Sequence, residues 1–481
     1  MVKADTKFFQ ILPDQEIDQI HQASLYILEN FGVRVDDPQL RNELYTRGCE
    51  IERDRVKFKG DLIRQVIDNV TREITFTGRS GKKSEVKPGH VIAHSTGGIP
   101  AMLDGETGRK RNARLSDFIQ AMRLVDHLDQ LDMPCALLYP EDVPAQISQI
   151  RQLEHMLKYS TKPIYGPGVS SAGEAKYIVE LFRVFAGTGA SLTENPIGLV
   201  GISPESPLYF PQEITDTMKF IIAAGIPTVI LSAPVAGISG PLTIAGGIAQ
   251  MNAEILAFAA IAYFINPQTP LIYGSRLNYP NMKNGTSIWG LPEVGIGNVA
   301  VAQLARRYGF LTDVYGLSCT SCTFDNQTGY EKAINAILPL IAGAHMFSGF
   351  GSMANLIVAS YEQLVIDNET FAMLRKVKRG MEVNPDTLAL DVISSVLHGG
   401  TFLEQEHTVR HLRAGEIFMP KLGFDHAWSE WEATGKKDIR IKAREAVKEI
   451  LVNDRFEPLP GEIEKEIDKI VQHAFQELVT R

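Results

Sequence analysis

The sequence predicts an α/β protein built on a (β/α)8 barrel, the TIM-barrel architecture. From Met133 onward, short apolar runs that end in Gly, Pro or Ser recur along the chain, and a segment with helical periodicity follows most of them. Continuously apolar strands that alternate with helices form parallel sheets covered on both faces. Eight such runs within about 240 residues fit a closed barrel better than an open sheet.

These eight runs are the predicted barrel strands. They begin at Pro134, Pro163, Pro196, Pro227, Pro270, Leu311, Met346 and Gln363. A doubly wound open sheet is the alternative architecture, but its first helix would open on a glycine-rich fingerprint, and PEDVPAQIS after the first run has none.

The rest of the chain divides around this barrel. Residues 1–115 are predicted to form an N-terminal helical part with a small β-sheet appendage, residues 116–400 the TIM-barrel domain, and residues 401–481 a C-terminal helical cap. Apolar spacings of three and four before Gly32 predict the first helix, and Gly-punctuated β-type runs between Glu73 and Arg111 predict the sheet. Two amphipathic helices are expected between Ile439 and Val479.

Composition excludes several classes of protein. The chain has 481 residues, with 48 Lys and Arg against 57 Asp and Glu, for a net charge of −9. This acidic balance argues against nucleic-acid binding, which requires a basic face. The apolar run Ile255–Ile265 is shorter than the roughly 18 to 20 residues that span a bilayer, so we expect no membrane segment. Four cysteines and no signal-peptide pattern predict a cytoplasmic protein.

Functional residues of such barrels lie where strands end. The residues that close the runs are aromatic or polar: Tyr139, Glu141, Tyr165, Ser203, Glu205, Ser232, Tyr273, Arg276, Asp325, Gln327 and Phe350. Aromatic faces and carboxylates together suit an organic cation. Each residue also has a structural alternative, because tyrosines pack at barrel rims, Glu141 and Glu205 suit helix N-termini, and Asp325 suits a helix N-cap.

Other chemistries find less support. Cys319 and Cys322 form a single CxxC, which leaves a zinc or redox site open as an alternative, and His407 and His411 have the spacing of a helical ligand pair. We predict no metal site. The GxSxG, HExxH and Walker motifs do not occur, so the sequence lacks the usual signatures of hydrolases and kinases.

Three segments resemble the trimethylamine:corrinoid methyltransferase superfamily. They are GLSCTSCTFDNQTGYEKAINAILPLIAGAH from Gly316, NPIGLVGISPESPL from Asn195 and HGGTFLEQEHTVRHLR from His398, and the segment PKLGFDHAWSEWEATGKKDI is similar to the C-terminal signature of that family. The resemblance covers essentially the whole chain. It implies a TIM barrel that transfers a methyl group from a methylamine to the Co(I) corrinoid of a partner protein.

Founding members carry pyrrolysine in the loop after the sixth strand, where this chain reads Cys319–Phe324 and has no lysine. The resemblance therefore implies the non-pyrrolysine branch, whose members resemble enzymes for quaternary amines. The expected substrate is glycine betaine, which would yield dimethylglycine, and carnitine, proline betaine or another methylamine are the alternatives. No cofactor is expected to bind tightly, since the cobalamin comes on the partner protein or as free cob(I)alamin.

Within this hypothesis each candidate residue has a role. Tyr139, Tyr165, Tyr273 and Phe350 would form an aromatic cage for the cation. Asp325 or Glu205 would supply the countercharge. The candidates for binding the substrate carboxylate are Arg276, His398, the Asn326 and Gln327 side chains and the helix N-terminus after Asp325. Asp325, Glu205 and His398 are the expected catalytic residues.

The expected partners are the small amine and a corrinoid protein. A homo-oligomer is also expected, because the apolar helix around Ala253–Ile265 and the C-terminal helices offer surface to bury, although both could equally belong to the core. Two alternatives of another kind stay open: a quaternary-amine binding protein that does not turn over, and zinc chemistry at Cys319 and Cys322.

Overall fold

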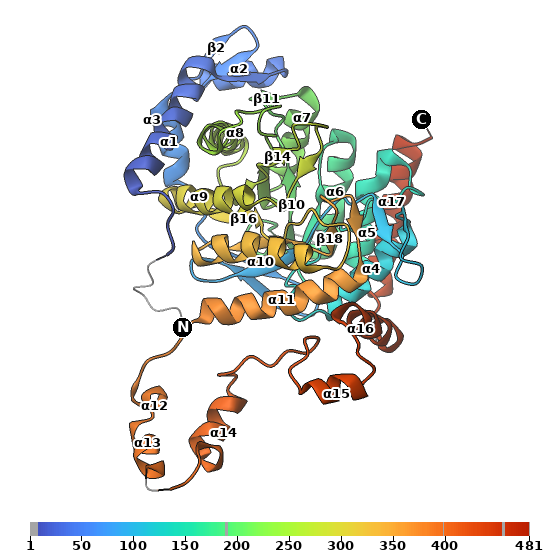
Figure 1. The fold of residues 1–481 in the computed structure, drawn as a ribbon. Coiled ribbons are helices and arrows are strands. Elements are labelled where there is room, and N and C mark those ends of the chain that lie inside the picture. The colour runs from blue at the N-terminus through green and yellow to red at the C-terminus, as the bar shows by residue number, and fades with distance from the viewer. Residues whose placement is uncertain (1–7, 188–190, 398, 455–456, 481) are drawn as a thin grey trace.

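The computed structural model describes residues 8–187, 191–397, 399–454 and 457–480. Within these ranges the centre of the molecule is a parallel sheet of seven strands, surrounded by helices (Figure 1). The strands are β6 (Ile92–Ser95), β9 (Ile164–Gly168), β10 (Gly198–Ile202), β12 (Thr228–Ser232), β13 (Leu271–Ser275), β16 (Leu311–Tyr315) and β17 (Met346–Phe350). They lie in the order β6-β17-β16-β13-β12-β10-β9.

Residues 133–138 fill the one remaining place in the eight-membered ring of the barrel, between β6 and β9. His94 of β6 forms a parallel bridge with Met133, and Cys135 forms a parallel bridge with Tyr165 of β9. The segment therefore lies between the two edge strands and closes the sheet, through single bridges rather than a regular ladder. The predicted TIM-barrel fold class is confirmed.

Two predictions about the strands were wrong. The run that begins at Gln363 lies in helix α11 (Tyr361–Arg379), whose N-cap Ser360 accepts a hydrogen bond from the Gln363 N–H. The first barrel strand is instead β6, in a segment predicted to belong to the β appendage. A short apolar run does not distinguish a buried strand from the buried face of a helix, and this ambiguity produced both errors. Counted along the chain, with β6 first and residues 133–138 second, the loop Cys319–Phe324 consequently follows the seventh barrel position.

One helix follows each barrel position in the described ranges, and together these helices cover the outside of the barrel. They are α4 (Leu115–His127), α5 (Ser148–Tyr159), α6 (Ala172–Ala186), α7 (Gln212–Ile221), α8 (Ile244–Ile265), α9 (Pro292–Tyr308), α10 (Asn326–Ile341) and α11. Helix α8 is long and apolar enough by composition to cross a membrane, but 83% of its most apolar window is buried inside the molecule. Its apolar surface is therefore core and does not provide the oligomer contact considered from the sequence.

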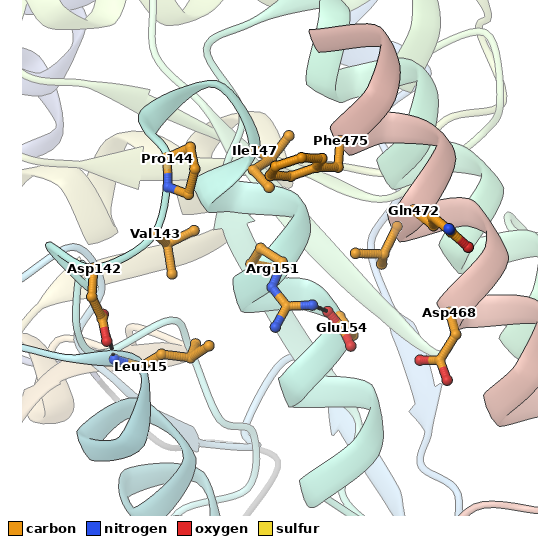
Figure 2. Close-up of a pocket in the computed structure, with 11 residues that line it drawn as sticks. Leu115, Asp142, Val143, Pro144, Ile147, Arg151, Glu154, Asp468, Gln472 and Phe475 are labelled. Atoms are coloured by element: carbon orange, nitrogen blue, oxygen red, sulfur yellow. Dashed lines mark hydrogen bonds and ion pairs between the residues drawn. The ribbon is translucent and has the colours of Figure 1, made fainter. Parts of the chain in front are cut away.

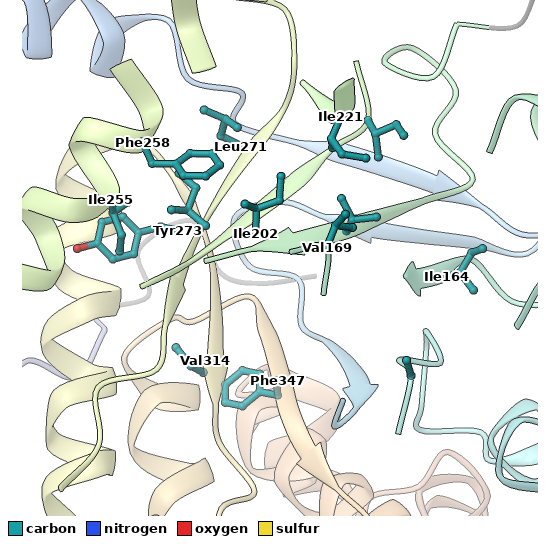
Figure 3. Packing of buried hydrophobic residues seen from close by; sticks show 14 of the residues in the cluster. Ile164, Val169, Ile202, Ile221, Ile255, Phe258, Leu271, Tyr273, Val314 and Phe347 are labelled. Carbon is teal, nitrogen blue, oxygen red and sulfur yellow. The ribbon is translucent and has the colours of Figure 1, made fainter. Parts of the chain in front are cut away.

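Side chains alternate between the inside of the barrel and the helix layer, as the pleat of a strand requires. Along β13, Ile272 belongs to the cluster inside the barrel and Tyr273 to the larger cluster beneath the helices. Figure 3 shows Tyr273 beside Ile255 and Phe258 of α8. The same alternation in β16 turns Leu311 inward and Val314 outward. This alternation decides which polar side chains reach the site.

Residues 8–115 contribute their other strands to three small sheets instead of one appendage sheet. Strands β1 (Val33–Val35), β2 (Glu50–Glu52) and β3 (Arg55–Lys57) pair with β11 (Tyr209–Phe210). The hairpin of β4 (Ile74–Thr77) and β5 (Lys83–Val86) packs against the interior cluster of the barrel. Strands β7 (Ala101–Leu103) and β8 (Lys110–Asn112) join β18 (Ser352–Met353) and β19 (Val358–Ala359). Helices α1 (Asp14–Tyr26), α2 (Pro38–Thr46) and α3 (Gly60–Asp68) and the π-helix Ile27–Phe31 complete this part.

The C-terminal part has two different halves. Helix α16 (Ile439–Asn453) packs on α11 and α4, and α17 (Gly461–Leu478) packs on α5 and α6. The four short helices between α11 and α16 instead extend away from the barrel (Figure 1). They are α12 (Pro385–Leu388), α13 (Leu390–Val396), α14 (Glu406–Arg413) and α15 (Trp428–Ala433). We call residues 381–433 the arm.

Candidate active site

A cavity of about 280 Å³ lies where the barrel strands end. This volume is near the lower limit of the roughly 300–1,000 Å³ of typical ligand pockets, and suits a small molecule. Side chains from seven barrel positions line it, among them His94, Cys135, Tyr165, Leu231, Arg276, Tyr315 and Ser348. The carboxyl ends of barrel strands are where TIM-barrel enzymes place their chemistry.

A buried network of charges surrounds Asp313 of β16. Its Oδ2 accepts hydrogen bonds from Arg276 Nη2 at 2.7 Å and from the Tyr165 hydroxyl at 3.2 Å, and its Oδ1 lies 3.0 Å from His94 Nε2. Burial alone would raise the pKa of the Asp313 carboxyl, but the positive charges and hydrogen bonds of Arg276 and His94 lower it below its usual range. Asp313 is therefore ionised at neutral pH.

Both ring nitrogens of His94 lie within hydrogen-bond distance of an oxygen atom. Its Nε2 faces the Asp313 carboxylate, and its Nδ1 lies 2.9 Å from the carbonyl oxygen of Ser95. Both partners only accept hydrogen bonds, so the doubly protonated imidazolium satisfies both contacts and either neutral tautomer satisfies one. Arg276 and His94 thus both contact the single carboxylate of Asp313.

Aromatic rings form the remaining wall of the cavity. Tyr139, Tyr165 and Tyr315 line it, and the ring of Trp289 meets that of Tyr315 edge-on with 4.9 Å between the centroids. Burial raises the pKa of Tyr165 and Tyr315 well above the usual value, so both hydroxyls stay protonated. The wall therefore contains neutral aromatic rings, a kind of group whose faces attract cations.

Cys135 is the one thiol among the lining residues that the structure describes. Burial raises the pKa of this thiol to about 12. Because the thiolate is the nucleophilic form of cysteine, Cys135 is unreactive at neutral pH. The cavity thus binds with charges and rings, and these lining residues offer no activated nucleophile.

The rim of the cavity combines a constrained turn with open space. Ala354, Asn355 and Leu356 have φ values of 49°, 57° and 67°, a left-handed conformation that Asn tolerates but that is unfavourable for Ala and Leu, and Leu356 lines the cavity. On the rim, a Cβ added at Gly98 or Gly168 would meet no atom within 4 Å. The cavity can therefore be approached by a bulky group at these glycines.

Comparison with known proteins identifies the family. Residues 1–478 match the family model described as trimethylamine methyltransferase (MTTB). The chain belongs to the MTTB family. The resemblance noted in the sequence is thereby confirmed, and the chain is a member of a methyltransferase family.

Individual relatives of this MTTB-family protein cover nearly its whole length. It is 28% identical over 468 residues to the trimethylamine methyltransferase MttB of Desulfitobacterium hafniense strain DSM 10664 / DCB-2, with 96% of this chain and 94% of the relative covered. It is also 28% identical over 469 residues to the glycine betaine methyltransferase of D. hafniense strain Y51, with 96% of each covered. The crystal structure of the hydroxylamine MtmB complex shares the fold, with a TM-score of 0.53, 14% identity, and 93% of this chain and 90% of that chain covered.

The cavity brings together three of the site residues predicted from the sequence. Tyr139, Tyr165 and Arg276 all line it, from three different barrel positions. Arg276 has a side-chain exposure of 17% and forms an ion pair with Asp313.

Two predicted cage residues lie outside the barrel lumen. Tyr273 faces the helix layer, where its hydroxyl donates a 2.9 Å hydrogen bond to Asn252 of α8. Phe350 packs against Phe371 of α11, with 5.3 Å between ring centroids. The register of β17 shifts between Phe347 and Phe350, and this irregularity turns Phe350 outward.

The predicted acidic and amide residues have local roles. Asp325 caps α10 by accepting hydrogen bonds from the Thr328 N–H at 3.1 Å and from the Ser321 hydroxyl at 3.0 Å. Gln327 donates to Glu331 at 2.8 Å. Glu205 is exposed and pairs through its backbone with Tyr209. Asn326 begins α10 and is exposed. His398 lies outside the described residues.

Sequence reasoning missed Asp313, His94 and Tyr315. Asp313 stands in the middle of the apolar run LTDVY, where a charged residue is costly unless it is paired and therefore marks a site. With Leu311 directed inward, alternation places Asp313 and Tyr315 inward as well. His94 was missed because its strand was assigned to the appendage.

The cysteine pair does not gather metal ligands in the described part of the chain. Cys319 is buried and contacts the carbonyl oxygen of Ser352 at 3.6 Å, whereas Cys322 is exposed. The one group of three ligating side chains found among the described residues is Asp386, His407 and His411, on the arm. Arg410 already forms hydrogen bonds with both carboxylate oxygens of Asp386, so these contacts order the arm and would compete with a metal.

A larger cavity, of about 420 Å³, lies outside the barrel between the loop Asp142–Ile147, helix α5 and helix α17. Figure 2 shows Arg151 and Phe475 directed into it, with Arg151 paired to Glu154. This cavity is away from the barrel lumen, where the strands converge and the buried charges lie. Position relative to the strands, and not size, identifies the smaller cavity as the candidate active site.

Proposed function

We propose that this protein transfers a methyl group from a quaternary amine to the Co(I) corrinoid of a partner protein, with glycine betaine as the substrate. Membership of the MTTB family supports methyl transfer. The observation that carries the substrate class is the cavity itself, in which neutral aromatic rings adjoin the Arg276, His94 and Asp313 network. A zwitterion with one cationic and one anionic end matches this division.

The cationic end belongs with the rings. Tyr139, Tyr165 and Tyr315 would surround the trimethylammonium group, each contributing up to ~2 kcal/mol when the contact excludes water. This set keeps two of the four cage residues predicted from the sequence and replaces Tyr273 and Phe350 by Tyr315. Asp313 replaces Asp325 and Glu205 as the nearest countercharge.

The anionic end belongs with Arg276. This guanidinium lines the cavity and hydrogen bonds to other residues through Nη1 and Nη2. Its positive charge is shared with the Asp313 carboxylate, and a substrate carboxylate would add a second anionic acceptor for its N–H groups. Arg276 is suited to such a contact because its planar fork binds carboxylates well.

In this reaction no side chain of the protein needs to form a covalent bond with the amine. When the N–CH3 bond of a quaternary amine breaks, the electron pair stays on nitrogen and a neutral tertiary amine leaves. The corrinoid supplies the nucleophile that receives the methyl group. The tasks of the chain are to hold the cation, direct one methyl group toward the open rim at Gly98 and Gly168, and exclude water.

The same proposal includes the setting of the reaction. The corrinoid arrives on a partner protein that docks over the loops at the mouth of the barrel, and the chain holds no tightly bound cofactor. The protein acts in the cytoplasm, in keeping with its free cysteines. Carnitine, proline betaine or another methylamine is the alternative substrate, and a quaternary-amine binding protein without turnover is the alternative function.

An anaerobic assay tests the proposal. The protein is mixed with chemically reduced cob(I)alamin and with glycine betaine, carnitine, proline betaine, choline or trimethylamine, and the loss of cob(I)alamin absorbance and the demethylated amine are measured. Glycine betaine is expected to react fastest and to yield dimethylglycine. Calorimetry with the same amines then reports binding without turnover, and the assay is repeated with the cognate corrinoid protein.

An Arg276→Gln variant makes the test specific. The KM for glycine betaine should rise about 100-fold, the effect of losing one charge-assisted contact, while Arg151→Gln at the outer cavity should leave it unchanged. Binding of glycine betaine without any dimethylglycine in either assay would favour the binding protein. A preference for choline or trimethylamine over every carboxylated amine would contradict the assigned role of Arg276.

A further inference from the structure

The arm has a defined shape but almost no core. Of its described residues only Leu422 is buried, and none in α12, α13, α14 or α15 is. Figure 1 shows it extending from the end of α11 and returning at α16, apart from the barrel. A segment of this kind cannot be stabilised by burial within its own chain.

Polar contacts hold the arm in place instead. Arg410 and His411 of α14 bind the Asp386 carboxylate of α12, which joins the two sides of the arm. The Glu369 carboxylate of α11 accepts hydrogen bonds from the backbone N–H groups of Lys421, Leu422 and Gly423 at 2.5 to 2.7 Å. The arm is therefore ordered before it meets any partner.

The surface that the arm presents is strongly apolar. Its exposed large hydrophobic residues are Met381, Val383, Leu388, Leu390, Ile393, Leu397, Phe402, Leu403, Val409, Leu412, Ile417, Met419, Phe424 and Trp428. Met373 and Val377, also exposed, lie one helical turn apart near the end of α11 and continue this surface onto that helix. Together the arm residues expose on the order of 1,500 Å², against the roughly 800 Å² that each partner buries in a standard interface.

Charge distribution indicates what covers this surface. The arm carries nine Asp and Glu residues against three Lys and Arg. The last turn of α11 carries Lys376, Lys378 and Arg379 beside the exposed Val377, and Lys376 and Arg379 also donate hydrogen bonds to the Gly415 carbonyl oxygen in the arm of the same chain. The arm is thus apolar and acidic, while the end of α11 is apolar and basic. These two surfaces are complementary, and each copy of the chain has both.

We propose that the arm is an assembly element that packs across α11 of a second copy of this chain, reciprocally in a two-fold dimer. Interfaces of transient complexes are about as polar as the rest of the protein surface, whereas the interfaces of permanent homodimers are as apolar as this one. The corrinoid protein must dock and leave in every cycle, so it is the poorer candidate. An anionic membrane would repel the acidic arm.

Analytical ultracentrifugation of the full chain at micromolar concentration tests this proposal. The wild type should sediment as a dimer or a larger even assembly, and the double variant Leu390→Glu/Leu403→Glu should sediment at the 53.2 kDa of one chain. Val452→Glu is the matched control, because Val452 on α16 is 83% exposed and Leu403 is 80% exposed. Circular dichroism verifies that each variant is folded.

Cross-linking gives a second measurement that does not depend on variants. Isotopically labelled and unlabelled protein are mixed, dissociated by dilution, reassociated and cross-linked, and mixed-label links between Lys421 of the arm and the lysines of α11 are expected. The proposal is overturned if the wild type is a monomer, if the double variant keeps the wild-type mass, or if Val452→Glu dissociates equally. A variant that keeps its mass but no longer binds the corrinoid protein would assign the arm to that partner and also overturn it.

Discussion

At the scale of single residues, the polar centre of the barrel depends on Asp313. This carboxylate is fully buried and is held by Arg276, His94 and Tyr165. A buried charge is costly unless it is paired, and removing one partner leaves the others uncompensated. The site therefore depends on Asp313 more than on any carboxylate at the rim.

We predict that Asp313→Asn lowers kcat/KM for methyl transfer from glycine betaine by about 100-fold or more, since it leaves the buried Arg276 guanidinium without a countercharge. Asp325→Asn serves as the matched control, because Asn is as good an N-cap as Asp and the change should cost less than about threefold. Steady-state kinetics on folded variants provides the measurement. The reverse order of effects would return the countercharge role to Asp325.

At the scale of elements, side-chain alternation explains what the sequence could and could not predict. Seven of the predicted runs occupy barrel positions, because an uninterrupted apolar run bounded by Pro and Gly is a strong strand signal. The run at Gln363 failed since a helix with one buried face shows the same apolar residues over a short window. Phe350 failed as a cage residue because a register shift in β17 leaves no trace in the sequence.

Side-chain alternation also decides which of the predicted site residues line the cavity. Tyr139 and Arg276 could be placed at the cavity from the sequence, because each follows the end of a barrel position and such residues lie at the barrel mouth, whereas Tyr165, the second residue of β9, lines the cavity because its side chain faces the lumen. Tyr273 also stands near a strand end but faces α8, and one position along a strand decides between the lumen and the helix layer. The strand β6, which supplies His94, could not be assigned because its short run lies among Gly-rich β-type segments.

The contact between α11 and the arm gives a prediction at this scale. Glu369→Ala removes the acceptor of three backbone N–H groups and should weaken the local order of the arm by about 2 kcal/mol, which corresponds to a roughly 30-fold faster amide exchange at Leu422 and Gly423. Glu369→Gln, which keeps an oxygen acceptor, should show a smaller effect. Hydrogen exchange followed by mass spectrometry measures both. Equal protection in the alanine variant and the wild type would show that other contacts hold the arm.

At the scale of the whole molecule, stability depends on histidines buried in their neutral form. Burial is the main cause that lowers the pKa of His155 to about 3 and that of His345 to about 4, and nearby cations act in the same direction. In the unfolded chain a histidine has a pKa near 6.5. The unfolded state therefore binds protons first as the pH falls, so stability is complete above about pH 6.5 and declines below it.

For His345 the free energy of unfolding should fall by about 2 kcal/mol between pH 7 and pH 5. Urea denaturation at the two pH values measures this change. In His345→Asn, which keeps an acceptor for the Thr312 N–H, the pH dependence should shrink by about that amount, and in His426→Asn, whose side chain is 63% exposed, it should stay as in the wild type. An unaltered pH dependence in His345→Asn would contradict the neutral state of the buried ring.

The hairpin of β4 and β5 has a consequence for the order of events in the proposed reaction. Ile74, Phe76 and Val86 pack against the interior side chains of the barrel at the end opposite the candidate site. Because these side chains close that end of the barrel, the amine cannot enter or leave there. The amine and the methyl acceptor must therefore both reach the site through the mouth of the barrel. The amine must then enter before the acceptor covers the mouth, and the demethylated product stays until the acceptor departs. The kinetics would be compulsorily ordered, with the small molecule first in and last out.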